Sequence, residues 1–338
     1  MIKERGLIIP EEYDAKYSIK ETEEAIKFVK DNFERKLARE LTLERVSAPL
    51  FVTVASGLND NLNGTERAVQ FDALDIDGEL QIVQSLAKWK RYALKLYDFE
   101  EECGLYTDMN AIRRDETLDN LHSIYVDQWD WEKVISKEER TIETLKTTVK
   151  KIYKALKDTE ELVCEKYSKL TKTLPAEITF ISSEELLKRY PDKTAKEREQ
   201  LITKEYGAVF IMQIGGKLSD GTKHDNRAPD YDDWELNGDI LIWFDILDCA
   251  VEISSMGIRV DEESMKKQLE IADCIDRSEL EYHKALLNGN LPYTIGGGIG
   301  QSRLCMLLLE RAHIGEVQSS IWPNDMREKC AEKGILLL

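Results

Sequence analysis

The sequence predicts a single α+β domain. Amphipathic helix patterns and strand-like apolar runs are interleaved along the 338 residues without a regular βαβ rhythm. No stretch rich in Pro, Gly and Ser marks a domain boundary, and no internal repeat is visible. We therefore expect one domain over residues 1–338, in which residues 1–18 form a short extension before the first helix.

The N-terminal half begins with a predicted long helix. Ser18 and Glu21 have the spacing of a capping box, in which two side chains cap the start of a helix. Apolar residues at helical spacing follow, namely Ile26, Val29, Phe33, Leu37 and Leu41. Residues 45–54 then resemble a strand, in which Pro49 indicates an edge or an end. The pattern of residues 85–97 fits either a helix or a strand, and residues 122–132 alternate as in a strand.

Two further capping boxes predict helices later in the chain, at Ser136 with Glu139 and at Thr194 with Glu197. The first opens a long amphipathic pattern, and Gly207 is placed to end the second helix. The remaining predicted elements are strands at 208–214, 239–244 and 250–253, a glycine-rich turn at 296–300, and an apolar helix from 301 to about 310.

Composition excludes several classes of function. Acidic residues outnumber basic ones by 65 to 47, for a net charge of −18, and a surface so negative repels nucleic acid. The longest apolar runs are far shorter than the ~20 residues that cross a bilayer, and the charged N-terminus lacks the apolar region of a signal peptide. Six scattered cysteines without a CxxC pair indicate reduced thiols. We expect a cytoplasmic protein that binds neither nucleic acid nor membranes.

The glycine-rich stretch excludes two familiar nucleotide sites. A dinucleotide fingerprint that starts at Gly298 requires glycine at position 303, where the chain has Arg303. A Walker-type phosphate loop requires Ser or Thr after Gly216-Lys217, and Leu218 stands there. The remaining pattern, Gly298-x-Gly300-x-x-Arg303, suits a phosphate or purine. Glycines let the backbone approach such a ligand, and the Arg303 guanidinium would project towards it from a rigid helix. A tight turn before a buried helix gives the same pattern.

That pattern resembles the third signature motif of class II aminoacyl-tRNA synthetases. The predicted helix at 19–41 with the strand near Pro49 resembles the first motif, which builds the dimer interface in that class. Arg113, followed by a loop and residues 125–132, resembles the second motif. Three motifs in the right order imply the catalytic core of this class, a mainly antiparallel sheet flanked by helices, and a homodimer.

Whole segments make the resemblance more specific, and from about residue 19 to the C-terminus the chain resembles the ammonia-dependent asparagine synthetases, or aspartate–ammonia ligases. The segments are 60–64 (Asp-Asn-Leu-Asn-Gly), 85–91 (Ser-Leu-Ala-Lys-Trp-Lys-Arg), 122–132, 215–221, 227–234 (Arg-Ala-Pro-Asp-Tyr-Asp-Asp-Trp), 254–259 and 294–303. One departure is a tight junction at 234–237, where some members have a longer loop. The resemblance implies that ATP and Mg²⁺ activate the β-carboxylate of L-aspartate as an adenylate, and that ammonia then displaces AMP.

The resemblance also implies the nucleotide-binding residues. Arg113 and Arg303 are expected to hold the phosphates and the adenine of ATP, beside Gly298 and Gly300, with Asp232 near the nucleotide. Asp239 and Glu252 lie on adjacent predicted strands and could coordinate Mg²⁺, which prefers carboxylate oxygens. Two exposed strand carboxylates in an acid-rich protein would give the same pattern.

The substrate aspartate must be held by its α-amino and α-carboxylate groups. Gln128 and Asp130 share one strand face with Glu132 and suit an ammonium group, whereas Trp129 and Trp131 point to the other face, where they fit a core. The residues that suit the α-carboxylate are Ser85, Lys90 and Arg259. In aspartyl-tRNA synthetases the arginine corresponding to Arg259 holds the side-chain carboxylate, so here we expect it to hold the end that does not react.

The second substrate arrives as ammonium and must lose a proton before it attacks. By resemblance Asp60 is the candidate that binds this cation and accepts its proton, although an Asp that caps a loop turn is an equal alternative. Glutamine-dependent synthetases expose a Cys nucleophile after Met1 is removed and carry a glutaminase domain. Residue 2 is Ile2, and the length leaves no room for that domain, so free ammonia is the predicted donor.

Two other functions compete with this interpretation. An aspartyl- or asparaginyl-tRNA synthetase-like protein would carry an anticodon-binding barrel before the core, but only about twenty residues precede the first predicted helix. A catalytically inactive paralogue would be expected to lack a motif arginine or a metal carboxylate, but Arg113, Arg303 and Glu252 are all present.

Overall fold

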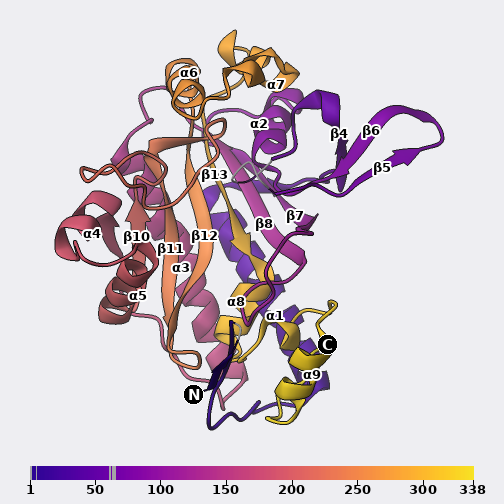
Figure 1. Cartoon of the computed structure of the whole chain (residues 1–338), viewed down its shortest axis with the longest axis vertical. Helices are drawn as coiled ribbons and strands as arrows, with labels where there is room; N and C mark the ends of the chain where they lie inside the picture. Colours follow the sequence, from indigo (N-terminus) through magenta and orange to yellow (C-terminus); the bar gives the residue numbers. More distant parts are fainter. Residues whose placement is uncertain (1, 5, 61, 63–65) are drawn as a thin grey trace.

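A computed structural model describes residues 2–4, 6–60, 62 and 66–338, and its centre is an eight-stranded sheet (Figure 1). In spatial order the strands are β3 (Leu43–Arg45), β7 (Gly104–Ile112), β8 (Tyr125–Val134), β13 (Thr294–Gly300), β12 (Cys249–Arg259), β11 (Asp232–Phe244), β10 (Ala208–Met212) and β9 (Thr179–Ser182). Apart from the edge pairs β3–β7 and β9–β10, which are parallel, the described strands of this sheet pair antiparallel. The prediction of a mainly antiparallel α+β fold is confirmed.

The helices cover both faces of the sheet. They are α1 (Ile19–Leu41), α2 (Ala87–Leu96), α3 (Ile142–Lys166), α4 (Ser183–Arg189), α5 (Ala195–Tyr206), α6 (Glu262–Ile271), α7 (Glu281–Leu287), α8 (Gln301–Leu308) and α9 (Asn324–Ala331), together with the 3-10 segments η1 (Val54–Ser56), η2 (Ile275–Glu279) and η3 (Ile314–Glu316). Among the described residues, no helix is both long and apolar enough to cross a membrane.

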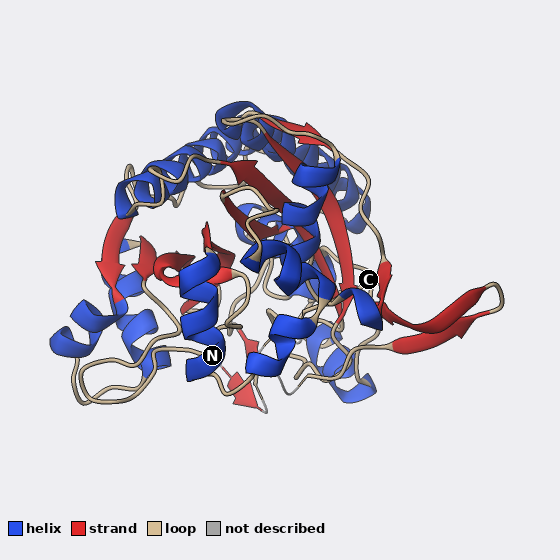
Figure 2. Ribbon diagram, turned by 90° about the horizontal axis from the view of Figure 1, so that it is seen from above, coloured by secondary structure: helices blue, strands red, loops and turns tan. Residues whose placement is uncertain are grey.

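The main hydrophobic core lies between the sheet and the two long helices α1 and α3, which pack side by side on one face (Figure 2). Trp129 and Trp131 of β8 are fully buried on this face, and the Trp129 ring lies 4.8 Å from the ring of Phe33 in α1, centroid to centroid. Their predicted place in the core is confirmed. The opposite face carries α2 at one side, against β7, β8 and β13, and α5 at the other, against β10, β11 and β12. Between α2 and α5, none of the described helices covers the middle of that face.

Helix boundaries agree with two of the three predicted capping boxes. Ser18 caps α1 and Thr194 caps α5, each with its glutamate, and Gly207 ends α5 at a positive φ of 75°. The third prediction is wrong, because α3 begins at Ile142 with Thr141 as its N-cap. Glu139 still accepts a hydrogen bond from the Ser136 amide at 2.8 Å, so the pair caps a turn that precedes the helix.

Several strand predictions need correction. Residues 45–54 are not one strand, since β3 ends at Arg45 and β4 (Phe51–Thr53) belongs to a separate three-stranded sheet with β5 (Gln70–Ala73) and β6 (Ile76–Ile82). The undecided segment 85–97 is the helix α2. Strand β10 stops at Met212, whereas β11 and β12 are longer than predicted, and the junction at 234–237 lies inside β11.

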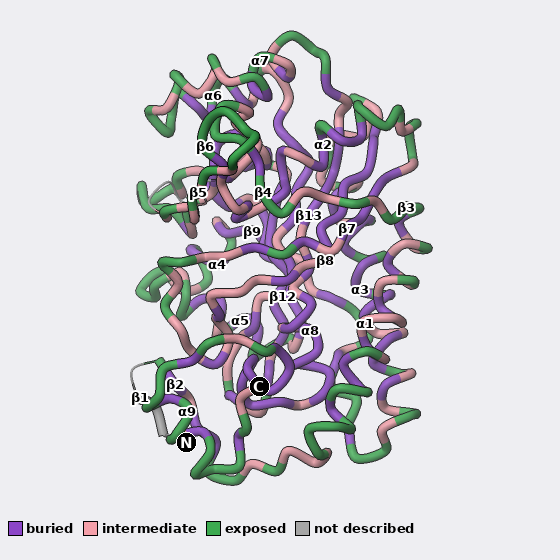
Figure 3. Tube along the Cα trace, turned by 90° about the vertical axis from the view of Figure 1, so that its right-hand side faces the viewer, coloured by how far each residue is buried: buried purple, intermediate pink, exposed green. Residues whose placement is uncertain are grey.

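Two segments lie at the rim of the molecule. The hairpin of β5 and β6 projects away from the main sheet (Figure 1), and most of it is exposed (Figure 3). Leu74 in its turn is fully exposed. The N-terminal extension forms a hairpin of β1 (Ile2–Glu4) and β2 (Leu7–Ile9). The Asn120 side chain accepts a hydrogen bond from the Ile8 amide at 2.6 Å and donates to the Ile8 carbonyl at 2.8 Å, which ties the extension to the loop after β7.

Candidate active site

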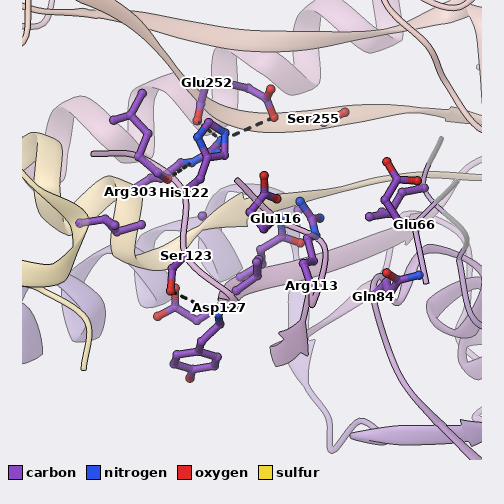
Figure 4. Close-up of a pocket in the computed structure, with 18 of the residues that line it drawn as sticks. Glu66, Gln84, Arg113, Glu116, His122, Ser123, Asp127, Glu252, Ser255 and Arg303 are labelled. Carbon is purple, nitrogen blue, oxygen red and sulfur yellow. Dashed lines mark hydrogen bonds and ion pairs between the residues drawn. The ribbon is translucent and has the colours of Figure 1, made fainter. Parts of the chain in front are cut away.

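The helix-free middle of the sheet is the floor of a cavity of about 370 Å³ (Figure 4). Predicted site residues in its lining are Arg113, Gln128, Glu252, Gly298, Gly300 and Arg303. In Figure 4, Arg303, Glu252 and His122 lie at one end and Glu66 and Gln84 at the other, with Arg113 between them. Segments far apart in the chain therefore meet in one polar site.

The glycines of β13 are needed for a different reason than the sequence suggested. Residues 294–300 form a strand rather than a turn, and Gly300 at its end is the N-cap of α8. A Cβ on Gly296 would overlap the Glu132 carboxylate, and one on Gly298 would lie 2.5 Å from the Gln128 side-chain oxygen. The missing side chains make room for the polar face of β8, so the predicted turn is wrong although its position beside the site was right.

A buried ionic layer adjoins the cavity floor on the predicted aspartate side. Lys90 of α2 forms an ion pair with Asp130 and donates to the Gly297 carbonyl at 2.8 Å. Arg259 forms an ion pair with Glu132 at 2.7 Å and a second one with Asp232. These residues are almost completely buried, and in the described part of the chain one oxygen of Asp130 has no hydrogen-bond partner.

Glu132 joins the two halves of this layer. Besides Arg259, it accepts a hydrogen bond from the Thr294 hydroxyl at 2.7 Å and lies 3.9 Å from the Lys90 ammonium. Burial favours the neutral form of Glu132, but the charge and hydrogen bonds of Arg259, together with Lys90 and Thr294, outweigh burial and hold the pKa of Glu132 below its usual value. Burial lowers the pKa of Lys90, despite the attraction of Asp130. The alternation in β8 placed Glu132 on this face but gave no sign that it connects Lys90 and Arg259.

Ser85 lies just before α2, where its hydroxyl accepts a hydrogen bond from the Ala87 amide at 3.1 Å. Gln128 is two residues before Asp130 on the same face of β8 and reaches the cavity itself. Gln128 therefore contacts the open volume, whereas Ser85, Lys90, Asp130 and Arg259 do not line the cavity.

The two motif arginines reach the cavity from different elements. Arg303, in the first turn of α8, donates to the Glu252 carbonyl at 3.0 Å and lies 4.0 Å from the Glu252 carboxylate. Arg113 follows the last residue of β7, and its buried Nε has no hydrogen-bond partner among residues 2–4, 6–60, 62 and 66–338. A guanidinium with an unused buried donor is suited to an anionic ligand.

A β-bulge brings Glu252 to the cavity. In the pairing of β11 with β12, Ile240 is opposite Ser254 and Leu241 is opposite Glu252, so Ile253 is an extra residue. Without the bulge, Glu252 and Ser255 would point to opposite faces, because side chains alternate along a strand. Both line the cavity. Ser255 was not predicted, and the bulge is invisible in the sequence pattern.

Asp239 lies opposite Ser255 on β11 and forms an ion pair with Arg227. Burial raises the pKa of Asp239 to about 6, with Arg227 lowering it and Glu252 raising it. Burial also raises the pKa of Glu252, but the charges of Arg303 and Arg227 outweigh it and keep that pKa low. Among the described residues, no group of three or more His, Cys, Asp or Glu side chains could hold a metal ion.

Asp60 lies beside the cavity rather than in its lining. Asp60 is 2% exposed, and one carboxylate oxygen accepts a hydrogen bond from the Leu62 amide at 2.9 Å, while the other has no partner among the residues that the structure describes. Burial raises the pKa of Asp60 to about 6, opposed by Lys88 and reinforced by Asp230. Most of the segment 60–64 that drew attention to it lies outside the described residues.

Some lining residues were not singled out from the sequence: Gln84, His122, Arg227 and Tyr231. Gln84 precedes the quoted segment 85–91 by one residue, and the other three lie within quoted segments. The resemblance therefore marked the right regions, whereas a physical reason to choose these side chains required the fold.

The sheet topology is that of the class II aminoacyl-tRNA synthetase fold, with a cavity on the open face of the sheet that Arg113 and Arg303 both reach. Two solved structures share it at low identity. Asparaginyl-tRNA synthetase from Entamoeba histolytica in complex with asparaginyl-adenylate has a TM-score of 0.62 at 13% identity, over 89% of this chain and 66% of that one. The enzyme from Pyrococcus horikoshii complexed with asparaginyl-adenylate gives 0.63 at 16%, over 90% and 70%.

Within that class, the family model described as aspartate-ammonia ligase matches residues 20–334. An aspartate–ammonia ligase of Clostridium perfringens is 63% identical over 333 residues, which are 98% of this chain and 99% of the relative. One of Pediococcus pentosaceus is 59% identical over the same shares of the two chains. The chain belongs to the aspartate–ammonia ligase family, which confirms the family predicted from the sequence.

Proposed function

We propose that the protein makes L-asparagine from L-aspartate, ammonia and ATP, with release of AMP and pyrophosphate, as a step of asparagine biosynthesis. The β-carboxylate attacks the α-phosphorus of ATP and expels pyrophosphate, and ammonia then attacks the β-carbonyl carbon and expels AMP. The observation that carries the proposal, beyond family membership, is a cavity with two arginines beside a buried ionic layer that suits an amino acid.

Arg113 and Arg303 hold the ATP phosphates and the adenine in this proposal. Attack of a carboxylate on a phosphate brings two anions together, so cations fixed before the reaction lower its barrier most. Gly298 and Gly300 line the cavity beside these arginines, and the missing side chain of Gly298 makes room for Gln128, which reaches the same cavity. Asp232 contributes indirectly through its ion pair with Arg259.

Asp239 and Glu252 would hold Mg²⁺, which neutralises charge on the phosphates when it is bound. Two carboxylates from adjacent strands fit an ion that takes most of its ligands from phosphate and water. One buried oxygen of Asp239 has no partner among the described residues, and this is the atom available to the ion.

The ionic layer and its neighbours provide separate groups for the α-ammonium and the α-carboxylate of aspartate. Asp130, with its unpartnered oxygen, and Gln128 receive the α-ammonium group. Ser85, Lys90 and Arg259 receive the α-carboxylate, and the β-carboxylate is left pointing towards Arg113 and the nucleotide. Asp60 binds ammonium through its free oxygen and takes up the proton that ammonium must lose before attack.

The proposal predicts the products of a single incubation. With ATP, Mg²⁺, aspartate and ammonium, mass spectrometry should detect asparagine, AMP and pyrophosphate, and AMP should not form without aspartate. No tRNA is required. ADP and phosphate as the nucleotide products would reject adenylation.

A cytoplasmic homodimer is also part of the proposal. Exposed apolar residues near the family's interface motif support it, since Leu50 and Phe51 are 49% and 46% exposed close to Pro49. Light scattering at micromolar concentration should give about twice the chain mass of 39.0 kDa. A mass near that of one chain would contradict the dimer.

A further inference from the structure

A second buried ionic cluster lies next to Asp60, outside the cavity lining. Its centre is Asp230, which has no solvent exposure. One Asp230 oxygen lies 3.4 Å from the Lys88 ammonium of α2, 3.3 Å from the Arg277 guanidinium of η2 and 2.9 Å from the His283 ring of α7. Three elements thus converge on one carboxylate, whose other oxygen has no hydrogen-bond partner within the described part of the chain.

Lys88 interacts electrostatically with two carboxylates, those of Asp230 and Asp60. It is 5% exposed, and after burial its charge has the largest influence on Asp60. Nevertheless its ion pair is with Asp230, and the free oxygen of Asp60 has no hydrogen-bond partner among the described residues. A buried ammonium and carboxylate normally pair, because each is costly to bury alone. In this structure the Lys88 ammonium pairs with Asp230 and forms no ion pair with Asp60 among the described residues.

We propose that Asp230 is a positioning residue that holds the Lys88 ammonium away from Asp60 and thereby keeps the Asp60 carboxylate free for substrate ammonium. This inference rests on the role of Asp60 in the proposed function. A lysine paired with the Asp60 carboxylate would compete with ammonium for its oxygens and would lower the basicity that Asp60 needs to take up the proton. Competition between Lys88 and ammonium for one carboxylate would appear as weak ammonium binding.

The charged groups that face Asp60 decide how its titration responds. They are Lys88 on α2, Arg113 after β7, and Asp230 and Tyr231 before β11. Asp60 is active when ionised, so activity with ammonium falls as the pH decreases through its pKa. Loss of the Asp230 charge removes a repulsion and releases Lys88, and both changes lower the pKa of Asp60. The acid limb of the pH profile then moves to lower pH, while the rate above it falls.

The test is Asp230→Asn, which keeps the size of the side chain and its hydrogen-bonding capacity. We expect the KM for ammonium to rise by about tenfold or more, with aspartate-dependent pyrophosphate exchange within a few-fold of wild type. The acid limb of kcat/KM for ammonium should shift to lower pH by about one unit. Hydroxylamine, which is mostly neutral at pH 7, should retain most of its wild-type rate as acceptor.

Two further variants separate positioning from general damage. In Lys88→Met/Asp230→Asn, the released cation is absent, so the KM for ammonium should return towards that of Lys88→Met alone. Asp233→Asn is the matched control, because Asp233 is buried in the same segment and forms an ion pair at 2.8 Å with Arg140, which is not among the groups that act on Asp60. It should leave the KM for ammonium unchanged.

An equal fall of exchange and ammonium turnover in Asp230→Asn, without recovery in the double variant, would show a structural role and overturn the inference. An unchanged KM for ammonium would overturn it as well. Failure of the proposed function looks different, because wild-type protein would then form no asparagine at all. Failure of the Asp60 role alone would appear as normal ammonium turnover in Asp60→Asn.

Discussion

Arg303→Ala should reduce turnover by about 10²-fold or more, the scale for removal of one preorganised electrostatic donor. The guanidinium projects from the first turn of α8 and is held by the Glu252 and Leu121 carbonyls, so it is fixed before ATP binds. Aspartate-dependent pyrophosphate exchange should fall in parallel, because the lost interaction acts in the activation step.

Two comparisons sharpen the Arg303 prediction. Arg303→Lys keeps the charge but loses the planar fork, so exchange should recover only in part. Arg327→Ala removes an exposed arginine from α9 and should leave exchange unchanged. Wild-type exchange in Arg303→Ala would mean that the Gly298–Arg303 pattern serves only the packing of β13 and α8.

Asp60→Asn should separate the two half-reactions. The change keeps the shape and most hydrogen bonding of the side chain but removes the negative charge that collects ammonium and accepts its proton. Pyrophosphate exchange should stay within a few-fold of wild type, whereas turnover with ammonium should drop by about 10²-fold or more, in the range for loss of a general base. Hydroxylamine, already nucleophilic, should restore part of the rate as aspartyl hydroxamate.

The pH dependence of wild-type activity also tests the role of Asp60. Because burial raises the pKa of Asp60 to about 6, activity with ammonium should be full above that pH and fall below it. Asp60→Asn should lose this acid limb. If exchange and ammonium turnover fall together, Asp60 serves aspartate binding or the loop. If neither falls, another carboxylate receives the proton, and Asp232 is the first to examine.

Much of the fold follows from local signals. Ser18 and Thr194 mark real helix starts because a capping box satisfies backbone amides whatever surrounds it. Trp129 and Trp131 are in the core because alternation fixes which strand residues share a face. The prediction of a helix start at Ser136 is wrong because Ser136 and Glu139 cap only a turn, and the helix begins after Thr141. Local patterns thus locate elements well where no tertiary contact competes with them.

The sequence predicted those cavity residues that belong to the recognised motifs. Arg113, Gln128, Glu252 and Arg303 do line one cavity, although only the resemblance connected them. Whether each residue performs its proposed role remains a prediction. The ion pair between Arg227 and Asp239 could not be found from the sequence. Arg227 lies in the loop before β11 and Asp239 lies within β11, beyond a register shift that the sequence pattern does not reveal.

The same limit applies to the ionic layer and to the glycines. Glu132 connects Lys90 with Arg259 through contacts between residues more than forty positions apart. The glycines of β13 look like a turn in sequence because nothing local reveals that Gln128 and Glu132 occupy the space of their side chains. Buried charge networks depend on long-range pairing, and a single sequence contains no direct signal for it.

One measurement tests the central claim most directly: transfer of oxygen from the β-carboxylate of aspartate to the nucleotide. Aspartate labelled with ¹⁸O in that carboxylate is incubated with ATP, Mg²⁺, ammonium and the protein, and the products are analysed by mass. If the carboxylate attacks the α-phosphorus, AMP carries one ¹⁸O atom and asparagine keeps the other. Label in inorganic phosphate, or AMP without label, would contradict the β-aspartyl-adenylate.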